Sequence, residues 1–140
     1  MENQFIAFKL GNEEYAVDIL AVKEIIRWIH ITRVPKAPSF VYGVINLRGN
    51  VIPVLNTHLR LQLPDIEIAD KSRIIIFQVE ELVVGLTVDE VVEVITLNDD
   101  MLEKPQMVEG NHRFIKNIGK IKNRLIMILD LPKIFDLKLI

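Results

Sequence analysis

Short apolar runs separated by polar turns follow one another along the whole chain. Most runs are apolar at odd and even positions alike and rich in valine and isoleucine; they span residues 5–10, 15–19, 25–34, 50–56, 73–79, 82–88, 91–97, 114–121 and 124–131. A period of two and β-branched residues both indicate strands. Strands that are apolar on both faces are typical of small closed barrels or packed sheets, because a sheet with one face in water keeps polar residues there.

Residues that favour tight turns separate these runs in pairs. Gly11-Asn12 and Gly49-Asn50 are strong turn sequences, and Glu80-Glu81 and Lys122-Asn123 occupy the same place with weaker turn residues. A tight two-residue turn joins antiparallel neighbours. Four such hairpins in one short chain predict an antiparallel, mainly β protein.

The two halves of the chain repeat one pattern of strand, short turn, strand, Val-Asp pair and a run rich in valine, glutamate and isoleucine. Three pairs of segments match: 5–26 with 74–95, within them 23–26 with 92–95, and further on 51–56 with 125–130. The spacing drifts by a few residues, and two copies are too few for a solenoid. The repeat therefore predicts two similar β units.

We expect these units to form a single domain over residues 1–140. The first barrel is predicted over about 12–66 and the second over about 72–130, and the terminal segments are candidates for completing the opposite barrel. The polar stretch 62–71 is expected to cross between the two barrels.

Short helical turns are predicted at three places. Asp18 is expected to cap a turn over 19–22, and Ser39 a turn over 40–42 that Gly43 ends. Asp130 with Pro132 predicts the start of a C-terminal helix, because proline suits the first helical turn. The least apolar part of the second half, residues 98–113, is predicted to be an exposed excursion with one helical turn.

Composition narrows the class of protein. Half of the 140 residues are hydrophobic, enough for a sizeable core, and the net charge is only −2. A balanced charge does not favour nucleic acid or an anionic membrane as the main partner. The chain contains no cysteine, its N-terminus does not resemble a signal peptide, and no apolar run reaches the roughly 18 residues of a membrane span. A cytoplasmic protein without membrane insertion is expected.

Catalytic and cofactor signatures are not evident. Glycine-rich phosphate loops are missing, and His30, His58 and His112 lack metal-ligand spacing. The only serines, Ser39 and Ser72, sit in no nucleophile motif. We therefore expect no enzyme activity, no cofactor and no metal. A packed β surface without reactive groups favours protein binding.

One segment carries a family signature. Residues 33–56, RVPKAPSFVYGVINLRGNVIPVLN, resemble the signature of the CheW family of bacterial chemotaxis coupling proteins. Two further blocks agree with the family, EYAVDI with Val22 and Glu24-Ile25 near the start, and Val84-Gly85 with Val88-Asp89 in the second half. The likeness covers nearly the whole chain. Asn56 departs from it, because the family generally carries aspartate there.

The resemblance implies a fold and a set of partners. The expected fold is mainly β: two SH3-like five-stranded β barrels packed together, with short helical turns and a C-terminal helix. The expected function is a cytoplasmic adaptor that couples the tips of chemoreceptors to the histidine kinase CheA, which itself carries a CheW-like regulatory domain. Self-association into rings stays open.

The resemblance also implies residue roles. The expected receptor-binding residues are Val22, Glu24, Asn46, Arg48, Val84 and Val88. Arg48 is expected to meet polar groups of a receptor helix, or to pair internally with Glu24, and the two roles are compatible. Each valine alone could be ordinary core, but we expect at least one of them to be exposed in a groove between the barrels. Gly43, Gly49 and Pro53 are assigned structural roles, Pro53 at an edge or bulge.

Two alternatives to this function remain at the level of sequence. One is a CheW-like regulatory module of another two-component system. The other is a small β-barrel module that binds nucleic acid, although basic residues are scattered and aromatic residues are few.

Overall fold

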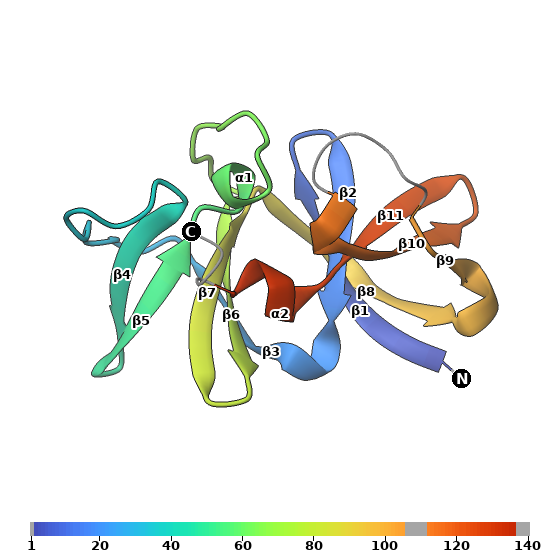
Figure 1. Ribbon diagram of the computed structural model, residues 1–140, viewed down its shortest axis with the longest axis horizontal. Helices are drawn as coiled ribbons and strands as arrows, with labels where there is room; N and C mark the ends of the chain where they lie inside the picture. The colour runs from blue at the N-terminus through green and yellow to red at the C-terminus, as the bar shows by residue number, and fades with distance from the viewer. Residues whose placement is uncertain (1, 106–111, 137–140) are drawn as a thin grey trace.

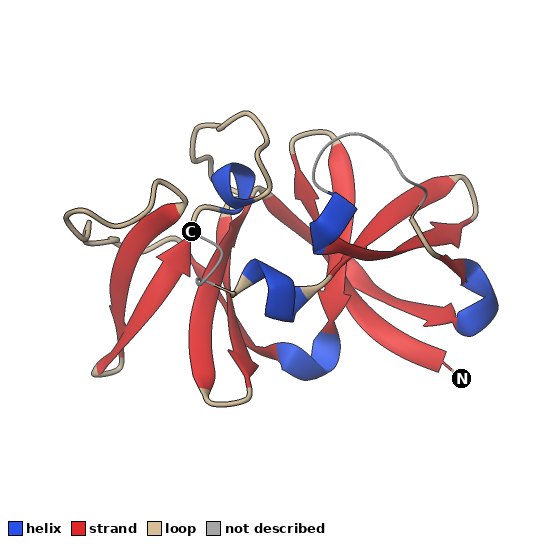
Figure 2. Ribbon diagram, viewed as in Figure 1, coloured by secondary structure: helices blue, strands red, loops and turns tan. Residues whose placement is uncertain are grey.

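Two curled β-sheets lie next to each other along the long axis of the molecule (Figures 1 and 2). The computed structural model describes residues 2–105 and 112–136. The six-stranded sheet contains, in spatial order, β8 (Glu90–Asn98), β1 (Glu2–Leu10), β2 (Glu13–Asp18), β11 (Arg124–Leu129), β10 (Ile115–Ile121) and β9 (Leu102–Glu103). The five-stranded sheet contains β3 (Val22–Arg27), β6 (Arg73–Val79), β7 (Leu82–Val88), β5 (Asn50–Leu55) and β4 (Val41–Leu47). The prediction of a mainly β fold is confirmed.

The four expected hairpins are present as β1–β2, β4–β5, β6–β7 and β10–β11. In β4–β5 the turn residues are Arg48 and Gly49, one position earlier than predicted, because Leu47 already pairs with Asn50. Both turn residues have positive φ, 51° and 86°. That conformation matches the twist of a two-residue hairpin, and glycine adopts it without strain.

The two halves of the chain exchange hairpins. β6 and β7 join β3, β4 and β5 in one sheet, while β1 and β2 join β8, β10 and β11 in the other. The predicted ranges 12–66 and 72–130 therefore do not separate the two sheets. The physical reason is that β1 and β6 are apolar on both faces, so each needs one face inside a barrel and the other against the neighbouring barrel.

Both sheets curl back on themselves through the segment that follows an edge strand. Beyond β3, Thr32 forms a two-hydrogen-bond bridge with Val44 of β4, with N···O distances of 2.8 Å in both directions. Beyond β8, the chain turns through residues 99–101 and pairs as β9 with β10. The short strand β9 is thus the counterpart of Thr32 in the other sheet. Each barrel is a five-stranded sheet that one additional short pairing closes.

Three apolar layers result from this arrangement. The inside of each curled sheet has its own cluster, around Phe5 and Ala7 of β1 in one and around Ile74 and Ile76 of β6 in the other. The alternate residues of the same strands, such as Phe8 and Phe77, meet in a third cluster between the sheets. The apolar positions on both faces are therefore explained strand by strand.

The helical predictions had mixed outcomes. The Asp18 carboxylate accepts a hydrogen bond from Leu20 N at 2.9 Å and caps the 3₁₀ turn η1 (Ile19–Ala21), as predicted. Asp130 caps α2 (Leu131–Ile134) through Lys133 N at 3.2 Å; the rest of the expected C-terminal helix, 137–140, lies outside the described residues. The helical turn predicted over 40–42 is wrong: β4 already begins at Val41, and the chain forms only a turn closed by the hydrogen bond from Val41 N to Pro38 O at 2.9 Å.

The remaining helical segments are short. α1 (Thr57–Arg60) follows β5, and two 3₁₀ turns, η2 (Asp99–Met101) and η3 (His112–Phe114), flank β9. The predicted excursion over 98–113 thus contains two helical turns and a short strand, and its residues 106–111 lie outside the described part of the chain.

Barrel closure can be tested at Gly43. Its φ is 155°, and a Cβ atom there would lie 2.1 Å from Thr32 O, inside the bridge that closes the five-stranded sheet. Replacing Gly43 by Ala should lower the free energy of unfolding by more than about 3 kcal/mol, because backbone must move. Gly49→Ala is the control: no atom lies within 4 Å, so only conformational strain of about 1–2 kcal/mol is expected. Urea unfolding of both variants measures the difference, and equal losses would contradict this explanation of closure.

Candidate functional site

The signature residue Arg48 lies at an exposed barrel end. Its guanidinium donates a hydrogen bond to the carboxylate of Glu24, and the two form an ion pair with side chains 66% and 27% exposed. Glu24 belongs to β3 and Arg48 follows β4, and these strands are the opposite edges of the five-stranded sheet. The pair therefore joins the edges at the barrel end, and the exposed guanidinium keeps donors for a partner.

The hairpin that carries Arg48 is held by Asn46. The Asn46 side-chain oxygen accepts a hydrogen bond from Gly49 N at 3.0 Å across the turn. Pro53 pairs with Val44 of β4, whereas the pairing of β5 with β7 begins only at Val54. The missing N–H of proline therefore leaves no partner unsatisfied.

The three valines differ in exposure. Val84 and Val88 are 3% and 1% exposed and belong to the core shared by the two sheets. Both lie on the face of the central strand β7 that packs against the other barrel, as expected for a single valine taken alone, and their part in receptor binding stays a prediction. Val22 is half-buried at the start of β3 and is the one of the three that keeps some accessible surface.

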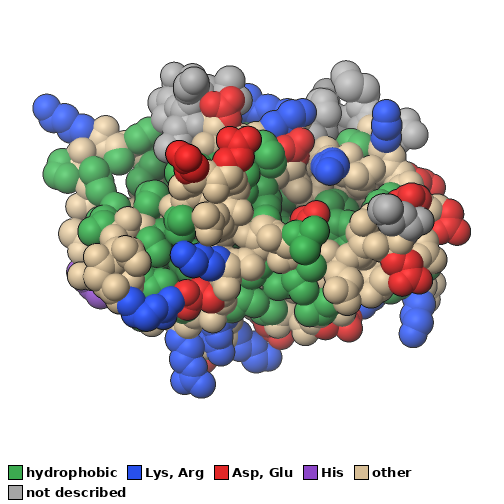
Figure 3. All heavy atoms as spheres, turned by 90° about the horizontal axis from the view of Figure 1, so that it is seen from below, with side chains coloured by type: hydrophobic (Ala, Val, Ile, Leu, Met, Phe, Trp, Pro, Cys, Tyr) green, Lys and Arg blue, Asp and Glu red, His purple; other side chains and the backbone are tan. Residues whose placement is uncertain are grey.

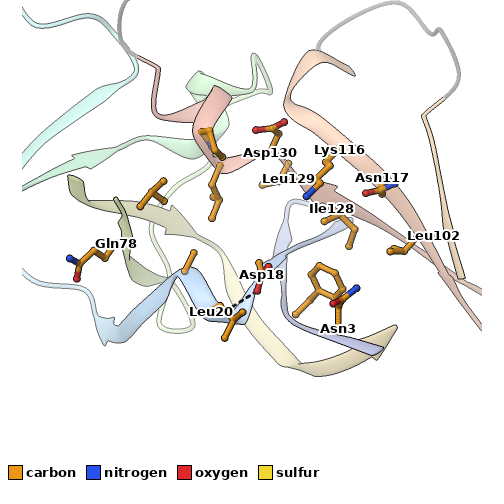
Figure 4. A pocket seen from close by; sticks show the side chains of 15 residues that line it. Asn3, Asp18, Leu20, Gln78, Leu102, Lys116, Asn117, Ile128, Leu129 and Asp130 are labelled. Carbon is orange, nitrogen blue, oxygen red and sulfur yellow. Dashed lines mark hydrogen bonds between the residues drawn. The ribbon is translucent and has the colours of Figure 1, made fainter. Parts of the chain in front are cut away.

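A groove opens between the barrels beside Val22 (Figures 3 and 4). Its volume is about 590 Å³, and it is lined by η1, by the start of β1 and by the segment from β11 into α2. Hydrophobic side chains reach the surface in the middle of the molecule, between charged groups (Figure 3). Leu20 is 90% exposed on the groove wall. An aliphatic side chain so exposed is a candidate contact for a partner.

Polar side chains stand among these apolar groups. Figure 4 shows Asp18, Asp130 and Lys116 at the groove, from three different elements. Within the described residues, each carboxylate receives one backbone hydrogen bond as a helix cap and keeps a second oxygen without one. The groove thus combines an apolar wall with unused hydrogen-bond acceptors.

Sequence reasoning missed a second ion cluster at the end of the six-stranded barrel. Arg124 binds Glu14 with two hydrogen bonds of 2.7 and 3.1 Å, and Glu93 with a third of 2.7 Å. The hydrogen bonds from Arg124 lower the pKa of Glu14, and those carboxylates raise the pKa of Arg124. Glu93 of β8 corresponds to Glu24 of β3 in the repeat. The alignment of these two glutamates is the sequence signal from which the second ion cluster could have been predicted.

Asn56 fits its surroundings through both atoms of its amide. The oxygen caps α1 by accepting from Leu59 N at 3.2 Å, and the nitrogen donates to Asp65 at 3.3 Å. Asn56 is 6% exposed. An aspartate could supply the cap but would face a second carboxylate, which explains the amide at this position.

Two searches covered the described residues. No group of three His, Asp or Glu side chains in the described ranges could hold a metal ion. A search of the same residues found no helix long and apolar enough to cross a membrane. The described residues form a β protein with an apolar groove between its barrels and an exposed arginine at a barrel end.

Comparison with known proteins gives the family. The model for the CheW-like domain matches residues 4–138. The chain is 40% identical to the chemotaxis protein CheW of Bacillus subtilis, over 95% of this chain and 86% of that protein, and 38% identical to that of Rhizobium meliloti, over 94% and 86%. The crystal structure of the scaffolding protein TtCheW from Thermoanaerobacter tengcongensis matches with a TM-score of 0.90 and 33% identity, over 98% of this chain and 90% of that one.

These findings define the class first: a scaffolding protein of chemotaxis signalling without catalytic activity. The chain belongs to the CheW family. The resemblance identified from the segment around Arg48 is thereby confirmed.

The Arg124 cluster gives a pH-dependent prediction. Arg124→Ala should lower the free energy of unfolding by about 1 kcal/mol at pH 7, because three charge-assisted hydrogen bonds are lost near the surface. Arg124 lowers the pKa of folded Glu14, so this stabilisation is complete above the unfolded pKa of about 4 and is lost as pH falls through the folded pKa. Thermal or urea unfolding from pH 7 to pH 3 measures the difference in free energy of unfolding between Arg124→Ala and the parent protein. A difference that does not become smaller below pH 4 would refute the stabilising role of the Arg124–Glu14 pair.

Proposed function

We propose that this protein couples the cytoplasmic tips of chemoreceptors to the histidine kinase CheA, and that it works in the cytoplasm as an adaptor with two separate contact surfaces. The observation that carries the proposal is the groove between the barrels, with Leu20 exposed on its wall and Glu24, the partner of Arg48, four residues further along the chain. Family membership supports the choice of partners. The balanced charge and scattered basic residues give no comparable support to a nucleic-acid partner.

The receptor tip is proposed to bind at the groove and the adjoining barrel end. Leu20 and Ala21 line the groove, Val22 follows them, and Glu24 then holds Arg48. Burying exposed aliphatic surface contributes roughly 25 cal/mol per Å² before the costs of association. Arg48 is fixed by Glu24 before binding, so its donors reach a receptor side chain with little loss of conformational freedom.

The kinase is proposed to bind at a barrel end through its own CheW-like domain. Val51 of β5 and Leu125 of β11 occupy matching positions in the two halves, and they are 70% and 62% exposed. Two barrels of the same design can associate through such matching surfaces. The same contact would permit weak self-association between copies of this chain.

The receptor contact can be tested with Arg48→Ala. We expect the affinity for a soluble receptor-tip hairpin to fall about tenfold, because a charge-assisted hydrogen bond is worth about 1.5–3 kcal/mol. The fold should persist, since the lost ion pair is exposed and contributes at most about 1 kcal/mol. Titration calorimetry measures the affinity and thermal unfolding the stability.

The matched control is Lys122→Ala. Lys122 is the first turn residue of the β10–β11 hairpin, as Arg48 is of β4–β5, and both have positive φ. The control variant should bind the hairpin with the parental affinity. If Arg48→Ala also binds normally while melting normally, Arg48 has no part in the receptor contact. A pull-down with the CheW-like domain of the kinase, alone and together with the hairpin, tests whether the two surfaces are separate.

A further inference from the structure

The two short helices α1 and α2 occupy matching places in the internal repeat. Each follows the last strand of its half, β5 or β11, and each has a side-chain N-cap, Asn56 or Asp130. The backbone nitrogens of the caps also bind matching phenylalanines: Asn56 N donates to Phe40 O at 2.7 Å, and Asp130 N donates to Phe114 O at 2.8 Å. Residues of one helix can therefore be compared position by position with those of the other.

The two helices meet at Arg60, the last residue of α1. Its counterpart is Ile134, the last residue of α2, and Arg60 Nε donates a hydrogen bond to Ile134 O at 2.8 Å. Arg60 Nη2 donates to Lys133 O at 3.2 Å and to Asp136 O at 3.0 Å. Figure 1 shows both helices near the middle of the molecule, α1 in green and α2 in red. One side chain of α1 thus binds three carbonyl groups at the end of α2.

The Arg60 guanidinium also contacts an aromatic ring from each half of the chain. Its central carbon lies 4.4 Å from the ring centre of Phe40 and 4.9 Å from that of Phe114, the two residues whose carbonyl groups bind the caps. Arg60 is 5% exposed, so its contacts are largely shielded from water. Hydrogen bonds from a charged group and cation–π contacts are stronger where water is excluded. Because the counterpart Ile134 is apolar, this contact between the helices is made from one side only.

The three hydrogen bonds supply what a one-turn helix lacks. The last carbonyl groups of a helix have no partner within the helix, and a helix of four residues is marginal in isolation. Arg60 offers these carbonyl groups a planar set of donors that are fixed relative to one another. The end of α2 is therefore held in a defined position relative to α1.

The other end of α2 is a wall of the groove between the barrels. Asp130, Leu131 and Pro132 line this groove, and the Asp130 carboxylate caps the same helix through Lys133 N. Lys133 O is one of the three acceptors of Arg60. The described residues that line the groove do not include Arg60. Arg60 therefore affects the groove through α2.

The matching end of α1 borders a second, much smaller cleft. Asn56 and His58 line it together with residues 65–68 of the crossing segment, and a volume of only about 10 Å³ is left. The Asn56 amide donates to Asp65 at 3.3 Å. Arg60 thus joins two helices whose N-terminal ends border two clefts, one filled by the chain itself and one open.

We propose that Arg60 is a positioning residue, which holds α2 against α1 and so keeps the groove wall of residues 130–132 in the place where a partner meets it. Arg60 acts from behind this surface, because it is buried and donates to the backbone of α2. The inference rests on the proposed function only for the partner used as a probe, since the position of α2 is measured without one.

The test compares three variants of the full chain. Arg60→Met keeps the length of the side chain and removes every donor, while Arg60→Lys keeps the charge and loses the planar arrangement of donors. Ile74→Val controls for stability, because Ile74 is fully buried inside the five-stranded barrel, in a cluster separate from that of α2. Native-state hydrogen exchange measures the opening of α2 at the amides of Ile134 and Phe135, which form backbone hydrogen bonds of this helix.

We expect the protection of these two amides, relative to those of the central strand β7, to fall at least tenfold in Arg60→Met, because donors to three carbonyl groups are lost. Arg60→Lys should show a smaller loss, and it decides the question if Arg60→Met does not fold. Ile74→Val should not lower this ratio. The affinity for a soluble receptor-tip hairpin, measured by titration calorimetry, should fall about tenfold in Arg60→Met and stay at the parental value in Ile74→Val.

The failures are distinguishable. If both Arg60 variants keep the parental protection in α2, Arg60 does not position this helix and the inference is overturned. It is also overturned if protection falls but the hairpin binds both variants as tightly as it binds the parent, because the groove wall then does not depend on Arg60. If the parent itself does not bind the hairpin, the proposed function is wrong, and the protection of α2 still decides the role of Arg60.

Discussion

The apolar layer shared by the two sheets is the constraint on which the rest of the structure depends. β1 and β6 each bury one face inside a barrel and the other against the neighbouring barrel, so neither strand has a face that could turn to water. The shared layer buries large side chains such as Phe8, Phe77 and Phe114 at 0% exposure. Because a packed layer resists sliding, the grooves on either side of it keep a fixed shape.

Hairpin exchange and barrel closure follow from that layer. The sheet that contains β1 and β2 takes its other strands from the second half of the chain, so the two halves of the chain cannot separate without breaking strand pairing. At the barrel ends, Arg48 with Glu24 joins the two edge strands of one sheet, and Arg124 joins β11 to β2 through Glu14 and to the edge strand β8 through Glu93. A rigid core of this kind suits an adaptor, because partners that bind to rigid surfaces keep a defined geometry relative to each other.

The features that the sequence predicted correctly are those that a few adjacent residues determine. Turn residues and β-branched runs indicated the hairpins, and Asp18 and Asp130 indicated caps, because each depends on a few adjacent residues. The exchange of β6–β7 between barrels was out of reach, since pairing between distant strands leaves no local mark. For the same reason the sequence could not decide which of Val22, Val84 and Val88 is accessible, because a strand buried on both faces and one that lines a groove have the same composition. The groove could not be predicted from the sequence, because Leu20, Lys116 and Asp130 are far apart in the chain and only the fold brings them together.

Internal duplication gives this fold two equivalent grooves, and a few side chains make them different. The strands, bulges and caps beneath both grooves are the same, so substitutions at their rims leave the shared core untouched. In one copy, Asp89 and His58 bond to each other and the crossing segment covers them. In the other, Leu20 and Pro132 leave an apolar wall that no described segment covers. A symmetric frame can in this way present a single asymmetric site, because stability resides in the repeated core and recognition in the rim.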